Sequence, residues 1–138
     1  MGDLVAQARH LAACHLRRWE LAEEIESLIA KRAEHGGGAS EPARRAAAFL
    51  LHLRGVRHAM QGDLDVAGRL LREADAALRF DGAQRGLLKL ENQLCLAEVL
   101  LARGQGDAAR EVVAGVRAVN PLLADGFEED RERLLGLG

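Results

Sequence analysis

The side chains best suited to bind a metal lie close together near the N-terminus. His10 and Cys14 are four residues apart, so a helix would place them on one face, and His15 follows directly. Imidazole and thiolate groups are ligands that zinc prefers. However, no HExxH, CxxC or paired ExxH pattern completes a coordination shell. We therefore predict neither a metal nor any other cofactor.

Two arginine–histidine pairs have residue types that could act on phosphate esters. Arg9 is followed by His15 and Arg45 by His52, with five and six residues between the partners. This spacing resembles that in a family of small helical ribonucleases. The resemblance implies that histidine would serve as acid or base while arginine steadies phosphate. A helical ribonuclease or nucleic-acid-binding module is thus one alternative for the function.

One predicted helix carries charge of a single sign. The segment 42–61 has four arginines and two histidines but no acidic residue, and Arg54, Arg57 and His58 share a face with Gln61. Such a face could meet phosphate or an acidic partner. Glutamates at 20, 23, 24 and 26 lie one helix upstream, and adjacent antiparallel helices commonly pair opposite charges. We favour neutralisation within the protein.

Composition narrows the classes of function. The 138 residues fit one domain, and the formal net charge of -2 provides no general attraction to nucleic acid or anionic membranes. The start of the chain has no signal-peptide run, and no segment is apolar enough to span a membrane, so we expect a cytoplasmic protein. Cys14 and Cys95 lie among apolar residues, which predicts reduced, buried thiols.

The elements that must position these residues are all helices, because alanine, leucine, arginine and glutamate dominate and tyrosine is absent. Apolar residues recur at helical spacing over 3–35. This segment could be one helix, since no glycine breaks it, or two helices with a tight corner at residues 17–19. A glycine run at 36–38 predicts a linker. Ser40 and Pro42 then predict a helix start, and this helix should run to about Gln61.

The second half of the chain has further glycine turns and helix-capping residues. Gly62 predicts a turn and Asp63 a cap for the helix that follows, while Asp81 and Gln84 resemble a capping box for a helix to about 103. Gly104 and Gly106 predict the next turn, with Asp107 as a cap. Asn120 and Pro121 should stop that helix, and a last one is expected at about 125–135, with a polar outer face.

The two best-defined hairpins resemble the tetratricopeptide repeat, a helix–turn–helix unit with small residues where its helices approach closely. In the segment 96–121 the turn glycine is Gly104, and Pro121 falls on the terminal proline. The middle unit has Gly62 at its turn but Arg79 in place of the proline. A first unit is a weaker match, with Arg17 at its turn. The small packing positions in the three units are Ala22, Gly55, Ala67, Ala74, Ala97 and Ala109.

The spacing departs from that family. The turn positions 17, 62 and 104 are 45 and 42 residues apart, whereas the repeat is about 34 residues long. Longer first helices would account for the difference. We therefore predict one all-α, tetratricopeptide-like domain over 1–138, a short right-handed superhelical stack. Its hairpins are expected at about 3–35, 41–79 and 83–120, followed by the capping helix.

The resemblance implies a concave groove lined by the first helix of each hairpin. Family members that grip a terminal carboxylate do so with lysines and asparagines, which this chain lacks at those positions, so a mostly apolar groove is expected. The same side chains could instead form a covered core. The resemblance places in the groove Phe49, His52, Val56, Met60, Leu94, Glu98 and Leu101.

These observations favour a non-enzymatic scaffold or adaptor. It would bind a helix or peptide of a protein partner, or a second copy of itself, through the apolar groove. Nucleic acid and membrane are not expected partners. Besides the ribonuclease, a second alternative is a regulatory or sensor domain of a signalling assembly, which would share the fold and differ in its partner.

Overall fold

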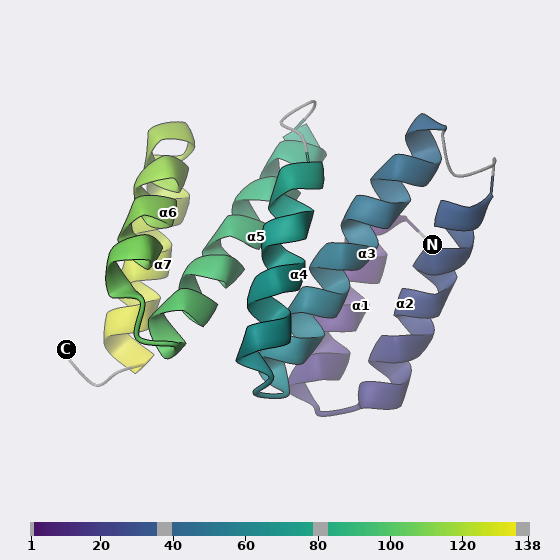
Figure 1. The fold of residues 1–138 in the computed structure, drawn as a ribbon, viewed down its shortest axis with the longest axis horizontal. Coiled ribbons are helices and arrows are strands. Elements are labelled where there is room, and N and C mark those ends of the chain that lie inside the picture. Colours follow the sequence, from purple (N-terminus) through teal and green to yellow (C-terminus); the bar gives the residue numbers. More distant parts are fainter. Residues whose placement is uncertain (1, 36–39, 79–82, 135–138) are drawn as a thin grey trace.

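The protein is all-α. The computed structural model describes residues 2–35, 40–78 and 83–134, and these form seven helices arranged in an elongated row (Figure 1). The first hairpin lies at one end of the row and the last two helices at the other. The helices are α1 (Asp3–His15), α2 (Trp19–Glu34), α3 (Glu41–Met60), α4 (Leu64–Ala77), α5 (Ala83–Ala102), α6 (Gly106–Val119) and α7 (Pro121–Leu134).

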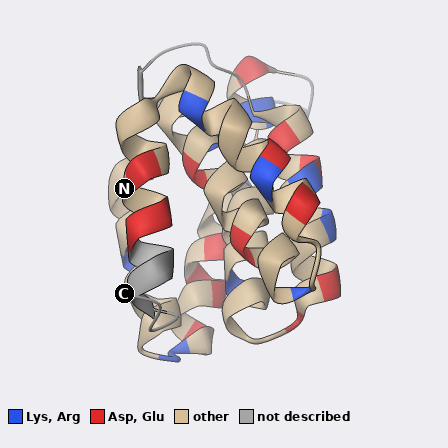
Figure 2. Ribbon diagram, turned by 90° about the vertical axis from the view of Figure 1, so that its left-hand side faces the viewer, with Lys and Arg blue, Asp and Glu red and all other residues tan. Residues whose placement is uncertain are grey.

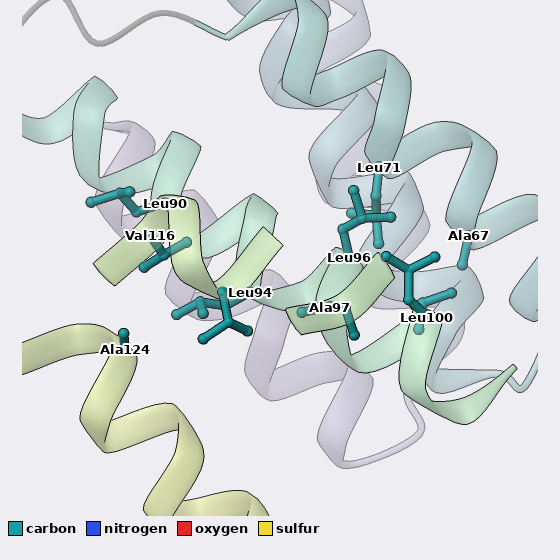
Figure 3. Close-up of a cluster of buried hydrophobic side chains, with 12 residues drawn as sticks. Ala67, Leu71, Leu90, Leu94, Leu96, Ala97, Leu100, Val116 and Ala124 are labelled. Carbon is teal, nitrogen blue, oxygen red and sulfur yellow. The ribbon is translucent and has the colours of Figure 1, made fainter. Parts of the chain in front are cut away.

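Each helix packs against the next one in the chain, in an antiparallel-like sequence. In addition α1 contacts α3, and α3 contacts α5. One cluster of buried apolar side chains joins α4, α5, α6 and α7, with Leu71, Leu100 and Val116 almost fully buried in it (Figure 3). A second cluster, around Ile29 and Leu53, joins α1, α2 and α3. The core therefore runs along the stack of helices.

The three hairpins share one turn geometry. In each turn a single residue has a left-handed backbone, namely Arg17 (φ 57°), Gly62 (φ 85°) and Gly104 (φ 78°). The N–H of that residue bonds the carbonyl three positions back, and the next N–H bonds the carbonyl five positions back, at 2.8–2.9 Å. This is the Schellman pattern of helix ends. The turn residues expected from the sequence thus occupy equivalent places, although the first of them is an arginine.

Small residues allow the helices to approach closely. A Cβ atom built on Gly55 of α3 would lie 2.7 Å from Leu71 Cδ2 of α4, so the contact between these helices has no room for a side chain. The alanines singled out as packing positions are all fully or almost fully buried: Ala22, Ala67, Ala74, Ala97 and Ala109.

The helix starts follow the expectations in part. The Ser40 hydroxyl accepts a hydrogen bond from the N–H of Ala43, as predicted for an N-cap. Asp63 occupies the N-cap position of α4, but its side chain makes no capping bond and lies 3.3 Å from His58 Nδ1. Asp107 does not cap α6, because that helix already begins at Gly106.

The two ends of the chain also differ in detail from the expected elements. Residues 3–35 form two helices, joined at the corner predicted around Arg17. The last helix begins at Pro121 rather than near 125, because Asn120 Oδ1 accepts the N–H of Leu123 and so caps a helix immediately after α6. Three positions considered in the sequence lie outside the described residues. They are the expected linker at 36–38, Arg79 in place of the repeat's proline, and Asp81 of the capping box.

Charge is spread over the whole stack. Figure 2 shows basic and acidic positions interspersed along the helices rather than gathered in separate regions. Among the described helices, none combines the length and the apolar character needed to cross a bilayer.

Candidate functional site

A groove of about 530 Å³ runs across the face formed by the odd-numbered helices. Ligand sites in proteins commonly have volumes of this order and mostly apolar walls. The groove has α3 and α5 among its lining helices, together with the first and last helices of the stack. Its lining residues are Gln7, His10 and Leu11 of α1, His52, Leu53 and Val56 of α3, Glu91, Leu94, Cys95 and Glu98 of α5, and Leu122, Leu123, Gly126 and Phe127 of α7.

His52 is held by a buried polar network that joins three helices. Asn92 Nδ2 donates to the carbonyl of Leu71 (2.9 Å), so Asn92 Oδ1 is left to accept a hydrogen bond from the Nδ1–H of His52 (2.9 Å). His52 is 3% exposed, and burial lowers the pKa of its imidazole from 6.5 to about 4, against the opposing effect of the Asn92 hydrogen bond. The ring is therefore neutral near pH 7, with its Nε2 lone pair unprotonated.

Apolar side chains are exposed beside the groove. Leu11 of α1 is 44% exposed and Leu122 of α7 is 84% exposed, and both line it. Exposing side chains of this kind to water is unfavourable, at roughly 25 cal/mol per Å² of apolar surface. These leucines would be stabilised by a ligand that covers them.

Two carboxylates lie on the α5 side of the groove. Glu91 accepts a hydrogen bond from the Gln7 amide of α1. Glu98 is seven residues further along, two helical turns away on the same face. The apolar surroundings raise the pKa of the Glu98 carboxyl, because they disfavour its charged form.

The structure brings four of the predicted groove residues together and places three elsewhere. His52, Val56, Leu94 and Glu98 line the groove. Phe49 is buried in the core cluster of α1, α2 and α3. Met60, at the C-terminal end of α3, is 36% exposed and does not line the groove. Leu101 packs on the main core and lines a smaller hollow between α5, α6 and α7.

Sequence reasoning missed the contributions of α1 and α7, Leu53 of α3 and two residues of α5. Glu91 and Cys95 stand three residues before Leu94 and three before Glu98, so their helical spacing was a usable signal. The leucines and Phe127 of α7 have no such signal, because the packing of the last helix against the stack brings them to the groove.

The arginines of the predicted basic face are paired within the protein. Arg57 donates to both oxygens of Glu26 (Nε–Oε2 2.7 Å, Nη2–Oε1 3.0 Å) and lies 3.5 Å from Glu23. Arg54 Nε is 3.8 Å from Glu26 Oε1, and His58 lies beside Asp63. The charge on this face of α3 is thus balanced by acidic neighbours on α2 and in the following turn.

Glu26 is the centre of a buried network between α1, α2 and α3. It also accepts a hydrogen bond from His10 Nε2 at 2.9 Å. Burial by itself would raise the pKa of Glu26, but the hydrogen bonds from His10 and Arg57 outweigh burial and hold that pKa below its usual value. The carboxylate is therefore charged and fully engaged.

The residues considered as metal ligands take part in packing. His10 Nδ1 lies 3.9 Å from Cys14 Sγ, and burial raises the pKa of the Cys14 thiol to about 11. His15 is exposed at the end of α1. Within the described residues, no three histidine, cysteine or acidic side chains are grouped as metal ligands would be. Cys95 is also a free thiol, half-buried beside the groove.

Of the two arginine–histidine pairs considered for phosphate chemistry, Arg45 and His52 each have a partner of another kind. Arg45 Nε lies 3.3 Å from Glu41 on the exposed surface of α3, whereas His52 is buried against Asn92. Arg9 and His15 are both exposed on α1. With a pKa of about 4, His52 is neutral near pH 7, and its one N–H is bonded to Asn92.

Comparison of this chain with protein-family models, with curated proteins and with solved structures finds no match. The function is therefore inferred from the geometry of the groove.

Proposed function

We propose that the protein is a non-enzymatic scaffold that holds an amphipathic helix of a protein partner in the groove between α1, α3, α5 and α7. The observation that carries the proposal is the groove itself, with a volume of about 530 Å³, a mostly apolar lining and exposed leucines beside it. An amphipathic helix that docks its apolar face in a groove is a common mode of peptide recognition.

The repeated hairpin supports a tetratricopeptide-like array as the framework of this scaffold. Three Schellman turns at equivalent positions and the packing of α1 on α3 and of α3 on α5 fit a stack of like units. In such a stack the first helix of each hairpin lines the concave face. The groove is lined by those helices and by α7, which we propose acts as the cap.

Site-specific photo-crosslinking tests the proposal. A photoreactive phenylalanine analogue is placed at Leu122, beside the groove, or at Leu28 on α2, which is 48% exposed and does not line it. The protein is expressed in its native cell. We expect a discrete crosslinked protein from position 122 and none from position 28. Equal crosslinking from both positions, or none from position 122, would contradict the proposal.

Charge-insertion variants provide the matched control. Leu11→Arg places a cation beside the groove, and Leu28→Arg places one on an outer face of similar exposure. We expect Leu11→Arg to abolish the crosslink from position 122 and Leu28→Arg to preserve it. Circular dichroism of both variants would establish that each retains its helix content. If the crosslinked species is a second copy of the chain, the groove serves self-association and does not bind the helix of another protein.

A further inference from the structure

The chemistry of the groove indicates what kind of helix it takes. Among the described residues that line it there is no lysine or arginine, whereas two are glutamates, Glu91 and Glu98 of α5. From the described part of the lining, a ligand bound there meets negative charge and no compensating lysine or arginine. An anionic segment would be repelled, because like charges placed together in an apolar site cost free energy.

Glu98 has no partner for its charge in the described part of the chain. No described residue forms an ion pair or a hydrogen bond with it, whereas Glu91 is bonded to Gln7. Glu98 is exposed, so water hydrates its carboxylate in the free protein. A ligand that covers this carboxylate removes its hydration, which costs free energy unless the ligand supplies a cation to pair with it. The groove therefore contains an anionic position that a ligand can satisfy.

His52 adds a second acceptor. Its Nδ1 is occupied by Asn92, so Nε2 is the ring nitrogen left for a ligand at the groove. At Nε2 a neutral imidazole of this tautomer can accept a hydrogen bond but cannot donate one. It favours a ligand that brings N–H groups, and it offers nothing to a carboxylate.

Resting on the proposed function, we infer that the groove selects an amphipathic partner helix whose apolar face carries one lysine or arginine, with Glu98 as the ion-pair partner of that cation. The apolar residues of the helix pack on Val56, Leu94 and Phe127. Glu91, held by Gln7, adds to the negative potential. The cation provides selectivity, and the apolar contacts provide most of the affinity.

Three synthetic peptides test this inference with the full-length chain. All are leucine–alanine amphipathic helices of about 18 residues, roughly 27 Å long, and they differ at one central position of the leucine stripe, which is lysine, glutamine or glutamate. Methyl NMR of Val56 and Leu94 reports groove occupancy and affinity at low salt. We expect the lysine peptide to bind about tenfold more tightly than the glutamine peptide, with the glutamate peptide weakest.

Two protein variants locate the selectivity. Glu98→Gln should remove the preference for lysine over glutamine, while Glu129→Gln, an exposed site on α7 outside the groove lining, should retain it. Because Glu98 lies at the surface of the groove, its variant is expected to fold, and circular dichroism checks this. Equal binding of the lysine and glutamine peptides, or a lysine preference that survives Glu98→Gln, would overturn the inference.

The outcomes separate this inference from the function on which it rests. If the glutamine peptide occupies the groove as well as the lysine peptide does, selectivity for a cation fails but helix binding stands. If no peptide perturbs the groove methyl groups, both fail. A dimer detected by sedimentation and dissociated by Leu122→Arg would place a second copy in the groove and would also overturn the inference.

Discussion

Arg57 of α3 binds Glu26 of α2 through two parallel hydrogen bonds, 2.7 Å from Nε to Oε2 and 3.0 Å from Nη2 to Oε1. Both oxygens of a carboxylate that is almost fully buried are thus engaged by one guanidinium. His10 of α1 adds a third hydrogen bond. Three helices of the N-terminal half are therefore joined by one polar network as well as by apolar packing.

Glu26→Gln should destabilise the fold strongly. The substitution preserves the shape of the side chain but removes the buried carboxylate from a largely buried guanidinium, which retains only the exposed Glu23 as a counter-charge. We expect a loss of about 3 kcal/mol of the free energy of unfolding. Glu23→Gln, at an exposed carboxylate 3.5 Å from Arg57, should change it by less than about 1 kcal/mol. Urea denaturation of both variants checks this. Equal losses would mean that the buried pair contributes no more than the exposed one.

His52 should make stability depend on pH. Burial lowers the pKa of this imidazole from 6.5 in the unfolded chain to about 4 in the fold. Between these values the unfolded state binds the proton and the folded state does not, so stability decreases as the pH falls from 6.5 to 4, by about 3 kcal/mol. Denaturation curves over this range, compared between wild type and His52→Gln, measure the effect.

The same substitution at His15 provides the control for that experiment. His15 is exposed, so His15→Gln should leave the dependence of stability on pH as it is in the wild type. His52→Gln should flatten it, although losing the Asn92 hydrogen bond will also lower the stability at every pH. A parallel pH profile for wild type and His52→Gln would show that His52 is not the titrating group.

Gly55→Ala should weaken the packing of α3 on α4. The added methyl group would lie 2.7 Å from Leu71 Cδ2, and Leu71 is fully buried, so relieving the overlap should cost about 1–3 kcal/mol of unfolding free energy. Gly115→Ala in α6 meets no atom within 4 Å and should instead stabilise the protein by up to about 1 kcal/mol. Thermal denaturation should shift in opposite directions for the two variants, and a shift in the same direction would contradict the close contact.

Removing a glycine from a left-handed turn and introducing one there should have different effects on stability. Gly62→Ala forces a Cβ atom into a backbone of φ 85° and should cost about 1 kcal/mol. Arg17→Gly relieves that strain at φ 57° and should be neutral or stabilising, since the greater freedom of glycine in the unfolded chain offsets part of the gain. Chemical denaturation measures both. A marked loss of stability in Arg17→Gly would mean that the arginine side chain stabilises the turn.

Much of the secondary structure could be predicted from local signals. The turns at Gly62 and Gly104 and the serine cap at Ser40 depend on residues within a few positions of one another, and the structure has them where the sequence indicates. At Arg17 the sequence left two possibilities open, a continuous helix or a corner between two helices, because arginine has no intrinsic preference for a left-handed backbone. The packing of α1 on α2 and α3 offsets the conformational cost of the left-handed backbone at Arg17.

The polar groups of the interior could not be predicted in the same way. Glu26 falls on the apolar stripe of α2 with Ala22, Ile25 and Ile29, and His52 falls on that of α3, so the periodicity places both inward. Periodicity does not say which partner each will meet. Asn92 lies 40 residues from His52 along the chain, and Arg57 lies 31 residues from Glu26.

By itself the sequence determined the helices, their turns and the small residues at which they approach, because backbone preferences and hydrophobic periodicity act over a few residues. Only the tertiary structure decided that Arg57 pairs with Glu26, that Phe49 is covered while Val56 lines the groove, and that α7 contributes to the groove. These outcomes depend on how the helices of the stack pack together, and burial and charge pairing are shared among residues far apart in the chain.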